Sequence, residues 1–199
     1  MDTYFTIESY AIAEYKERGS RFLAYSFPLK DAANLKKHLQ QLKTEHPKAT
    51  HYCFAYRIGI DGNNFRSSDN GEPPRTAGKP ILGQIDSKNL TDILIIVVRY
   101  FGGTLLGVPG LINAYKTSSS LVLQCTPVIQ KTIEIRYTLQ FNYTEINEVM
   151  RIIKEYNCTI YKNEMQLFCK MEIGIPKNKM EEIKAPFSDI KNLEFYKSN

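Results

Sequence analysis

The chain has 199 residues, of which 43% are apolar and 24% are charged, a composition ordinary for a globular protein with a buried core. Its longest aliphatic run, residues 93–98, is far shorter than the roughly 20 residues that a membrane-spanning helix needs. The first residues lack the basic and apolar segments of a secretory signal, so we expect a cytoplasmic protein without a membrane partner.

The net charge of +5 is unevenly distributed. Residues 1–131 contain 16 Lys and Arg against 11 Asp and Glu, whereas residues 132–199 contain 10 of each. The whole positive excess therefore lies in the first part, which is the better candidate for binding a polyanion such as RNA. An excess of this size is also compatible with a role in solubility alone.

Cysteine and histidine are too scattered to indicate a disulfide framework or a zinc site. Neither a Cys-x-x-Cys motif nor a pair of neighbouring histidines occurs. We expect reduced, mostly buried thiols and no metal or other cofactor. The residues concerned are Cys53, Cys125, Cys158, Cys169, His38, His46 and His51.

In chain order, the first apolar segments predict strands near residues 4–13 and 21–27, joined by a turn at residues 17–20. Asp31 follows, placed to cap a helix that carries leucines on one face, at positions 35, 39 and 42.

A third strand is expected at residues 52–60, and Asp61-Gly62 after it is a strong hairpin signal. Residues 93–98 are apolar at every position, which predicts an interior strand covered on both faces. Apolar residues repeat at helical spacing over residues 111–124, which predicts a helix.

Thr126-Pro127 ends this helix, and we place a domain boundary between residues 126 and 131. The predicted domains are residues 1–128 and 132–199. The second contains, in order, a strand at 133–141, a helix at 146–153, strands at 158–161 and 167–173 joined by a turn at 162–164, a helix at 178–185 and a strand at 193–196. This β-α-β-β-α-β order predicts a ferredoxin-like domain, so the fold class is α+β.

Two loops rich in glycine and proline, residues 68–80 and 99–110, flank the apolar strand. Glycine adds chain entropy and proline lacks an N–H donor, so we predict irregular structure there. Loops that carry charged side chains are common binding sites. The candidate ligand-binding residues on and beside them are His51, Arg66, Asp69, Glu72, Arg75, Thr76, Lys79, Arg99, Gly102, Gly103 and Gly107.

The strings SDNGEPPRTAGKPIL and VVRYFGGTLLGVPGLINAY, preceded by HYCFAYRIG at 51–59, resemble the signature of the YigZ/IMPACT family. The chain departs from the usual family pattern at Asn70, at Pro74-Arg75 and at Pro109-Gly110. The resemblance implies a first domain like the second domain of ribosomal protein S5 and a ferredoxin-like second domain similar to a domain of elongation factor G.

Both of those ribosomal relatives lie on RNA, and the eukaryotic IMPACT branch regulates translation under stress. That branch carries an additional N-terminal partner-binding domain, which is missing from this sequence, so the resemblance implies the bacterial two-domain branch. Our leading hypothesis is therefore a non-enzymatic regulator of translation that binds RNA or a ribosome-associated partner through a groove between the two loops.

The residues themselves support nucleic-acid binding through basic groups interleaved with aromatic ones, as single-stranded RNA requires. The basic residues are Arg57, Arg66, Arg75, Lys79 and Arg99, and the aromatic residues are Tyr52, Phe65, Tyr100 and Phe101.

Three alternatives stay open. A phosphate or nucleotide could bind where the strand, glycine turn and helix meet, although the spacing matches neither common phosphate motif and Pro109 removes one amide. A small enzyme could use His51, Asp69, Glu72 and Arg99, with Cys53 beside them. Protein interaction through the ferredoxin-like domain is the third.

A purely structural interpretation competes with all of these. Asp69 and Glu72 would then accept amide hydrogen bonds within their own loop, and Arg99 would pair with one of them and fasten the two loops. The glycines would serve close packing of the chain.

Overall fold

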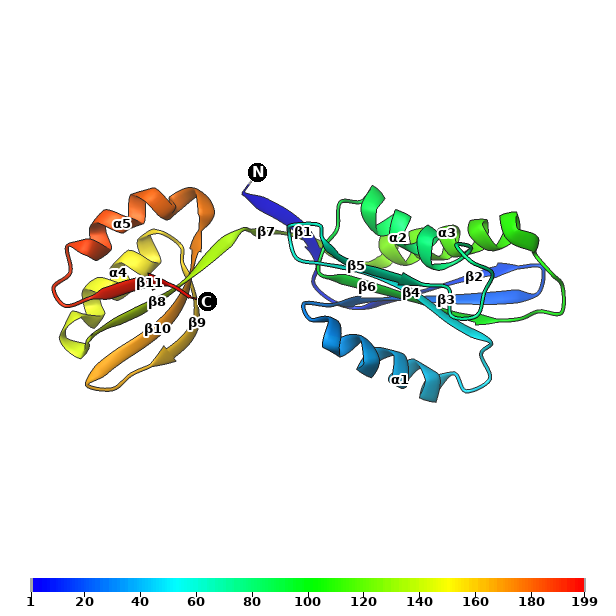
Figure 1. The fold of residues 1–199 in the computed structure, drawn as a ribbon, viewed down its shortest axis with the longest axis horizontal. Helices are drawn as coiled ribbons and strands as arrows, with labels where there is room; N and C mark the ends of the chain where they lie inside the picture. The colour runs from blue at the N-terminus through cyan, green and yellow to red at the C-terminus, as the bar shows by residue number, and fades with distance from the viewer. Residues whose placement is uncertain (1, 199) are drawn as a thin grey trace. The chain divides into compact units, whose positions relative to one another are not determined.

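The computed structural model describes residues 2–198 and divides them into two compact units (Figure 1). The first unit is Tyr4–Gln130, and the second runs from Lys131 onward and includes Asp2 and Thr3. Each unit combines helices with an antiparallel sheet around its own core, so the predicted α+β class is confirmed. Among the described residues, no helix is both long and apolar enough to cross a membrane.

The first unit is built on a five-stranded sheet with the order β2-β3-β6-β4-β5. Every neighbouring pair in it is antiparallel. The predicted interior strand is confirmed, because residues 93–98 of the central strand are fully buried. The strands are β2 (Ala11–Glu17), β3 (Ser20–Pro28), β6 (Ile93–Tyr100), β4 (His51–Ile58) and β5 (Asn64–Ser68).

Helices cover both faces of this sheet (Figure 1). Helices α2 (Gly78–Ser87) and α3 (Gly107–Cys125) lie on one face, and α1 (Leu35–Glu45) lies on the other. Successive strand residues point to opposite faces, so β4 places Cys53 in the α2 and α3 core and Phe54 in the α1 core. The central strand contributes side chains to both cores in the same way.

The second unit has the order β11-β8-β10-β9, with α4 (Ile146–Glu155) and α5 (Met180–Ser188) packed on one face. Its chain order is β-α-β-β-α-β, which confirms the ferredoxin-like prediction. The strands are β8 (Glu134–Asn142), β9 (Thr159–Glu164), β10 (Phe168–Pro176) and β11 (Glu194–Lys197).

Short elements complete the chain. Strands β1 (Thr3–Ile7) and β7 (Val128–Thr132) form a separate two-stranded sheet. Three 3-10 turns precede helices: η1 (Ala32–Asn34), η2 (Tyr143–Glu145) and η3 (Lys177–Lys179). Asp31 caps the first of these rather than α1 itself, accepting a hydrogen bond from the Ala33 amide.

Three predicted element boundaries are wrong. Residues 4–13 hold parts of two strands, β1 and β2, because the chain turns at residues 8–10. The turn between β9 and β10 lies at residues 165–167, since residues 162–164 pair with β10.

The third error concerns the glycine and proline segments, which are not loops throughout. Helix α2 begins at Gly78 and α3 begins at Gly107, so residues 78–80 and 107–110 are helical. Proline is tolerated in the first turn of a helix because the amide it lacks has no partner within the helix there.

Candidate functional site: a buried ion pair beside a pocket, and a basic groove

Asp69 organises the first loop from within. Its carboxylate oxygens accept hydrogen bonds from the amides of Arg75, Ala77 and Gly78, at 2.8, 3.0 and 2.8 Å. This confirms the expectation that Asp69 accepts amide hydrogen bonds in its own loop. The carboxylate also lies at the start of α2, where a negative charge stabilises the helix.

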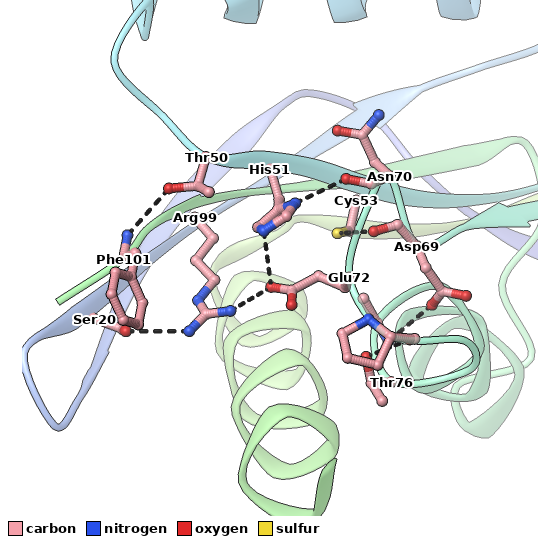
Figure 2. A network of polar contacts seen from close by, with 12 residues as sticks. Ser20, Thr50, His51, Cys53, Asp69, Asn70, Glu72, Thr76, Arg99 and Phe101 are labelled. Atoms are coloured by element: carbon pink, nitrogen blue, oxygen red, sulfur yellow. Dashed lines mark hydrogen bonds and ion pairs between the residues drawn. The ribbon is translucent and has the colours of Figure 1, made fainter. Parts of the chain in front are cut away.

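Glu72 was also expected to accept hydrogen bonds from loop amides, but its carboxylate accepts none from the amides of the described residues and pairs with Arg99 at 2.6 Å instead (Figure 2). The predicted pairing of Arg99 with a loop carboxylate is therefore confirmed. Both side chains are buried, 3% and 6% exposed, and the Tyr115 hydroxyl donates to the same Glu72 oxygen at 2.8 Å. The pair joins the loop to the end of β6 and to the middle of α3.

His51 connects this ion pair to the loop. Its Nδ1 donates to the Asn70 carbonyl oxygen at 2.8 Å, because a carbonyl can only accept. Its Nε2 then lies 3.9 Å from the Glu72 carboxylate (Figure 2). The Asn70 side chain, at a left-handed φ of 43°, accepts from the Tyr52 amide and so fixes the loop against β4.

Cys53 and Tyr115 are fully buried in the core beneath the ion pair. The Cys53 Sγ is 2.9 Å from the Asp69 carbonyl oxygen and 3.2 Å from the Tyr115 hydroxyl. Burial raises the pKa of the Cys53 thiol to about 12, and burial also raises the pKa of Tyr115. Both groups are therefore protonated at neutral pH, which makes Cys53 a poor nucleophile and Tyr115 a donor to Glu72.

The raised pKa of Cys53 predicts a loss of stability in alkali. The unfolded thiol, with an ordinary pKa of 9.0, releases its proton before the folded one does, so stability is complete below pH 9 and falls as the pH rises toward 12. We expect a fall of up to about 1.4 kcal/mol per pH unit from this thiol. Urea unfolding between pH 8 and 10 measures it.

Cys53→Ala is the control for this prediction, because it removes the titrating group from the folded and the unfolded state alike. Its stability should change less with pH over the same range. An equal slope in the wild type and the variant would show that the thiol is not responsible.

A pocket of about 360 Å³ lies beside the ion pair, and we call it the Glu72 pocket. It brings together four of the predicted site residues: His51, Glu72, Arg99 and Gly107. Phe101, expected from the sequence as an aromatic contact for RNA, also lines it. The rest of its wall was missed, although exposed apolar residues after a glycine turn are a usable signal for a binding surface. These residues are Thr50, Pro73, Leu105, Leu106, Val108 and Leu111.

Arg75 and Lys79 line a different depression, between α2 and α3, which we call the basic groove. Lys116 of α3 adds a third cation that the sequence interpretation missed. It lies four residues after Ile112, so the two share one face of the helix. The remaining wall consists of Pro80, Gly83, Gln84 and Ile112.

The other predicted residues do not join either site. Arg66 pairs in register with Tyr56, whose side chain is in the α1 core, and its guanidinium lies 5.9 Å from the Phe54 ring centroid. It therefore faces the opposite side of the sheet from the basic groove. Thr76 is buried and donates to the Pro73 carbonyl oxygen, which is a structural role.

Gly102 and Gly103 have structural reasons to be glycine. A Cβ on Gly102 would lie 1.9 Å from the backbone carbon of Gly19, so the turn between β2 and β3 approaches the end of β6 too closely for any side chain. Gly103 adopts a φ of +84°, in the region that favours glycine. The single groove expected from the sequence is thus two sites, with the glycines serving the packing between the chain segments.

Comparison with known proteins identifies the family of the chain. Residues 18–123 match the model of the Impact N-terminal domain. The chain is 32% identical over 172 residues to the IMPACT family member YigZ of Escherichia coli, covering 85% of this chain and 84% of that one. It is 30% identical over 194 residues to an IMPACT family member of Haemophilus influenzae, covering 95% and 93%.

One solved structure, of a hypothetical protein, superposes with a TM-score of 0.78 at 28% sequence identity, covering 100% of this chain and 98% of that one. The two-unit architecture is thus shared over the full length. With a family model that matches more than half of its residues and relatives aligned over most of its length, the chain belongs to the IMPACT family.

Proposed function

We propose that the protein is a non-enzymatic regulator of translation that binds single-stranded RNA in the basic groove of its first unit. The observation that carries this proposal is the charge of the groove. Its described lining holds Arg75, Lys79 and Lys116 and includes no carboxylate. Cations gathered without counter-ions are the usual electrostatic basis of nucleic-acid binding.

The basic groove also has space for an RNA backbone to approach helix α2 closely. Gly83 lies inside α2, where glycine destabilises a helix relative to alanine, yet a Cβ there would meet no atom within 4 Å. Packing within the fold therefore does not require glycine at this position. A missing side chain between Lys79 and Lys116 lets a sugar-phosphate backbone lie against the helix.

A role in translation is supported by membership of the IMPACT family, because the resemblance to that family implies a regulator of translation. The enzyme alternative finds less support in the geometry. Asp69 is engaged by three loop amides and Glu72 by a buried arginine, so the two carboxylates have structural partners. Binding of a ribosome-associated protein instead of RNA is an outcome that the test below separates.

The test reverses the groove charges in the full chain, with Arg75→Glu, Lys79→Glu and Lys116→Glu combined. We expect the wild type to bind a short labelled single-stranded RNA with roughly micromolar affinity that weakens as salt increases. If each cation neutralises one phosphate, the variant should lose about 2 from the slope of log K against log salt, because each contact contributes about 0.7. Fluorescence anisotropy over a salt series measures both quantities.

A control with the same change of net charge uses the other face of the sheet. Lys36→Glu, Lys37→Glu and Arg66→Glu alter exposed residues on the side that α1 covers. This variant should keep most of the wild-type slope. If both variants lost the same amount from this slope, net charge alone would explain the effect. Co-sedimentation with ribosomes in the absence of RNA binding would indicate a protein contact instead.

A further inference from the structure

One oxygen of the Glu72 carboxylate, Oε2, is not used by the buried ion pair. The polar contacts of this carboxylate within the described chain all involve the other oxygen, Oε1. That oxygen lies 2.6 Å from Arg99 Nη1, 2.8 Å from the Tyr115 hydroxyl and 3.9 Å from His51 Nε2. Oε2 accepts no hydrogen bond from the described residues, and it is not among their fully enclosed side-chain atoms without a partner, so it is accessible where Glu72 lines the pocket. A carboxylate oxygen favours a donor, and here the pocket is where one can come from.

His51 lies near the same carboxylate, with its Nε2 3.9 Å from Oε1. In the tautomer whose Nδ1 donates to the Asn70 carbonyl, Nε2 is an acceptor, and His51 lines the Glu72 pocket. Two neighbouring acceptors match a group with two N–H donors on one nitrogen. A primary amino group has this geometry, whereas a hydroxyl offers only one donor.

The walls of the Glu72 pocket suit a flat, partly apolar ligand. Phe101 is 47% exposed and Leu105 is 82% exposed, and both line the opening with Val108. The Arg99 guanidinium lies 5.7 Å from the Phe101 ring centroid, and its buried Nε has no hydrogen-bond partner among the described residues. The volume of about 360 Å³ is within the range of small-ligand pockets.

The Glu72 pocket is adjacent to the basic groove along the same two segments. On α3, Val108 and Leu111 line the pocket, and Ile112 and Lys116 line the groove in the turns that follow. On the first loop, Pro73 lines the pocket and Arg75 lines the groove. A strand whose phosphates lie in the groove therefore passes the mouth of the pocket.

We propose that the Glu72 pocket binds one unstacked nucleobase that carries an exocyclic amino group, and so favours adenine, cytosine or guanine over uracil. The amino group donates to Glu72 Oε2 and to His51 Nε2, while the ring stacks on Phe101. Uracil offers a single ring N–H between two carbonyl oxygens, and those oxygens are repelled by a carboxylate. This inference rests on the proposed function, which supplies the RNA strand, and adds its base preference.

The experiment compares oligouridines of one length in which a single central base is U, A, C or G, bound to the full chain at one salt concentration. We expect each amino-bearing base to raise affinity about tenfold, since one good base contact typically gives 1–3 kcal/mol of discrimination. Phe101→Ala should reduce this gain, and Phe65→Ala, an exposed aromatic outside both sites, should leave it intact.

Glu72→Gln supplies a second readout at a temperature where circular dichroism shows the variant folded. It should keep its binding to oligouridine, through the groove, and lose the preference for amino-bearing bases. Equal affinity of the wild type for all four oligonucleotides would overturn the base pocket and leave the proposed function standing. If no oligonucleotide binds, the proposed function fails and the base pocket fails with it.

Discussion

Glu72→Ala is expected to destabilise the first unit by about 3–5 kcal/mol, the usual cost of leaving one member of a buried ion pair without its partner. Arg99, which is only 5% exposed, would keep its charge without a carboxylate partner, and the Tyr115 hydroxyl would lose its acceptor. Urea unfolding followed by circular dichroism measures the change.

The double variant Glu72→Met and Arg99→Met makes this prediction sharper. It removes both charges together, so it should be less destabilised than the sum of the single variants and possess a large coupling energy. The exposed pair of Arg151 and Glu155 on α4, at 2.9 Å, is a matched control, and Glu155→Ala should cost less than about 0.5 kcal/mol. A Glu72→Ala cost as small as that of the control would show that the buried pair does not hold the loops together.

Gly102→Ala is expected to be the most damaging of three glycine replacements, at about 3 kcal/mol or more, because a side chain cannot be accommodated without separating two backbone segments. Its Cβ would lie 1.9 Å from the carbon and 2.2 Å from the oxygen of Gly19. No rotamer change relieves a clash between main-chain atoms and a Cβ. Thermal unfolding of the variants measures the order of stability.

Two other glycines, Gly103 beside Gly102 and Gly83 inside α2, separate the possible causes. Gly103→Ala meets open space but must hold a φ of +84°, so it should cost about 1–2 kcal/mol from backbone strain alone. Gly83→Ala meets nothing and lies inside α2, so it should stabilise the protein by about 0.5–1 kcal/mol. If Gly102→Ala and Gly103→Ala were equally costly, steric contact with Gly19 would not be the reason for glycine at 102.

The fold was predictable where one periodicity acts over a whole element. The uninterrupted apolar run of β6 and the alternation along β8 and β10 each reflect burial that is uniform along a strand. Helix α2 could not be found in this way, because its first turn contains Gly78 and Pro80 and resembles a loop. Its stability comes instead from Ile81 and Ile85, which are buried against the sheet.

Of the candidate site, only the contacts between the two loops were predictable from the sequence. The pairing of Arg99 with a loop carboxylate followed from the chemistry of two charged loops, but the participation of Tyr115 depends on a contact 43 residues away. Arg66 could not be assigned to a face of the sheet because its strand, β5, was not predicted, and a side chain's face is fixed only by its position in the register. Lys116 was missed because it forms a cationic groove only together with Lys79, which is on another helix, α2.

The central place of β6 also has a consequence for biosynthesis. Strands β3 and β4, which precede it in the chain, do not pair with each other, and each finds its partner in β6. Until residue 100 has left the ribosome, the β2-β3 hairpin, α1 and the β4-β5 hairpin share no central strand, and α3 has still to follow. Folding during synthesis is therefore delayed until most of the first unit has been made, and a chain that stops before residue 93 exposes apolar strands to aggregation or proteolysis.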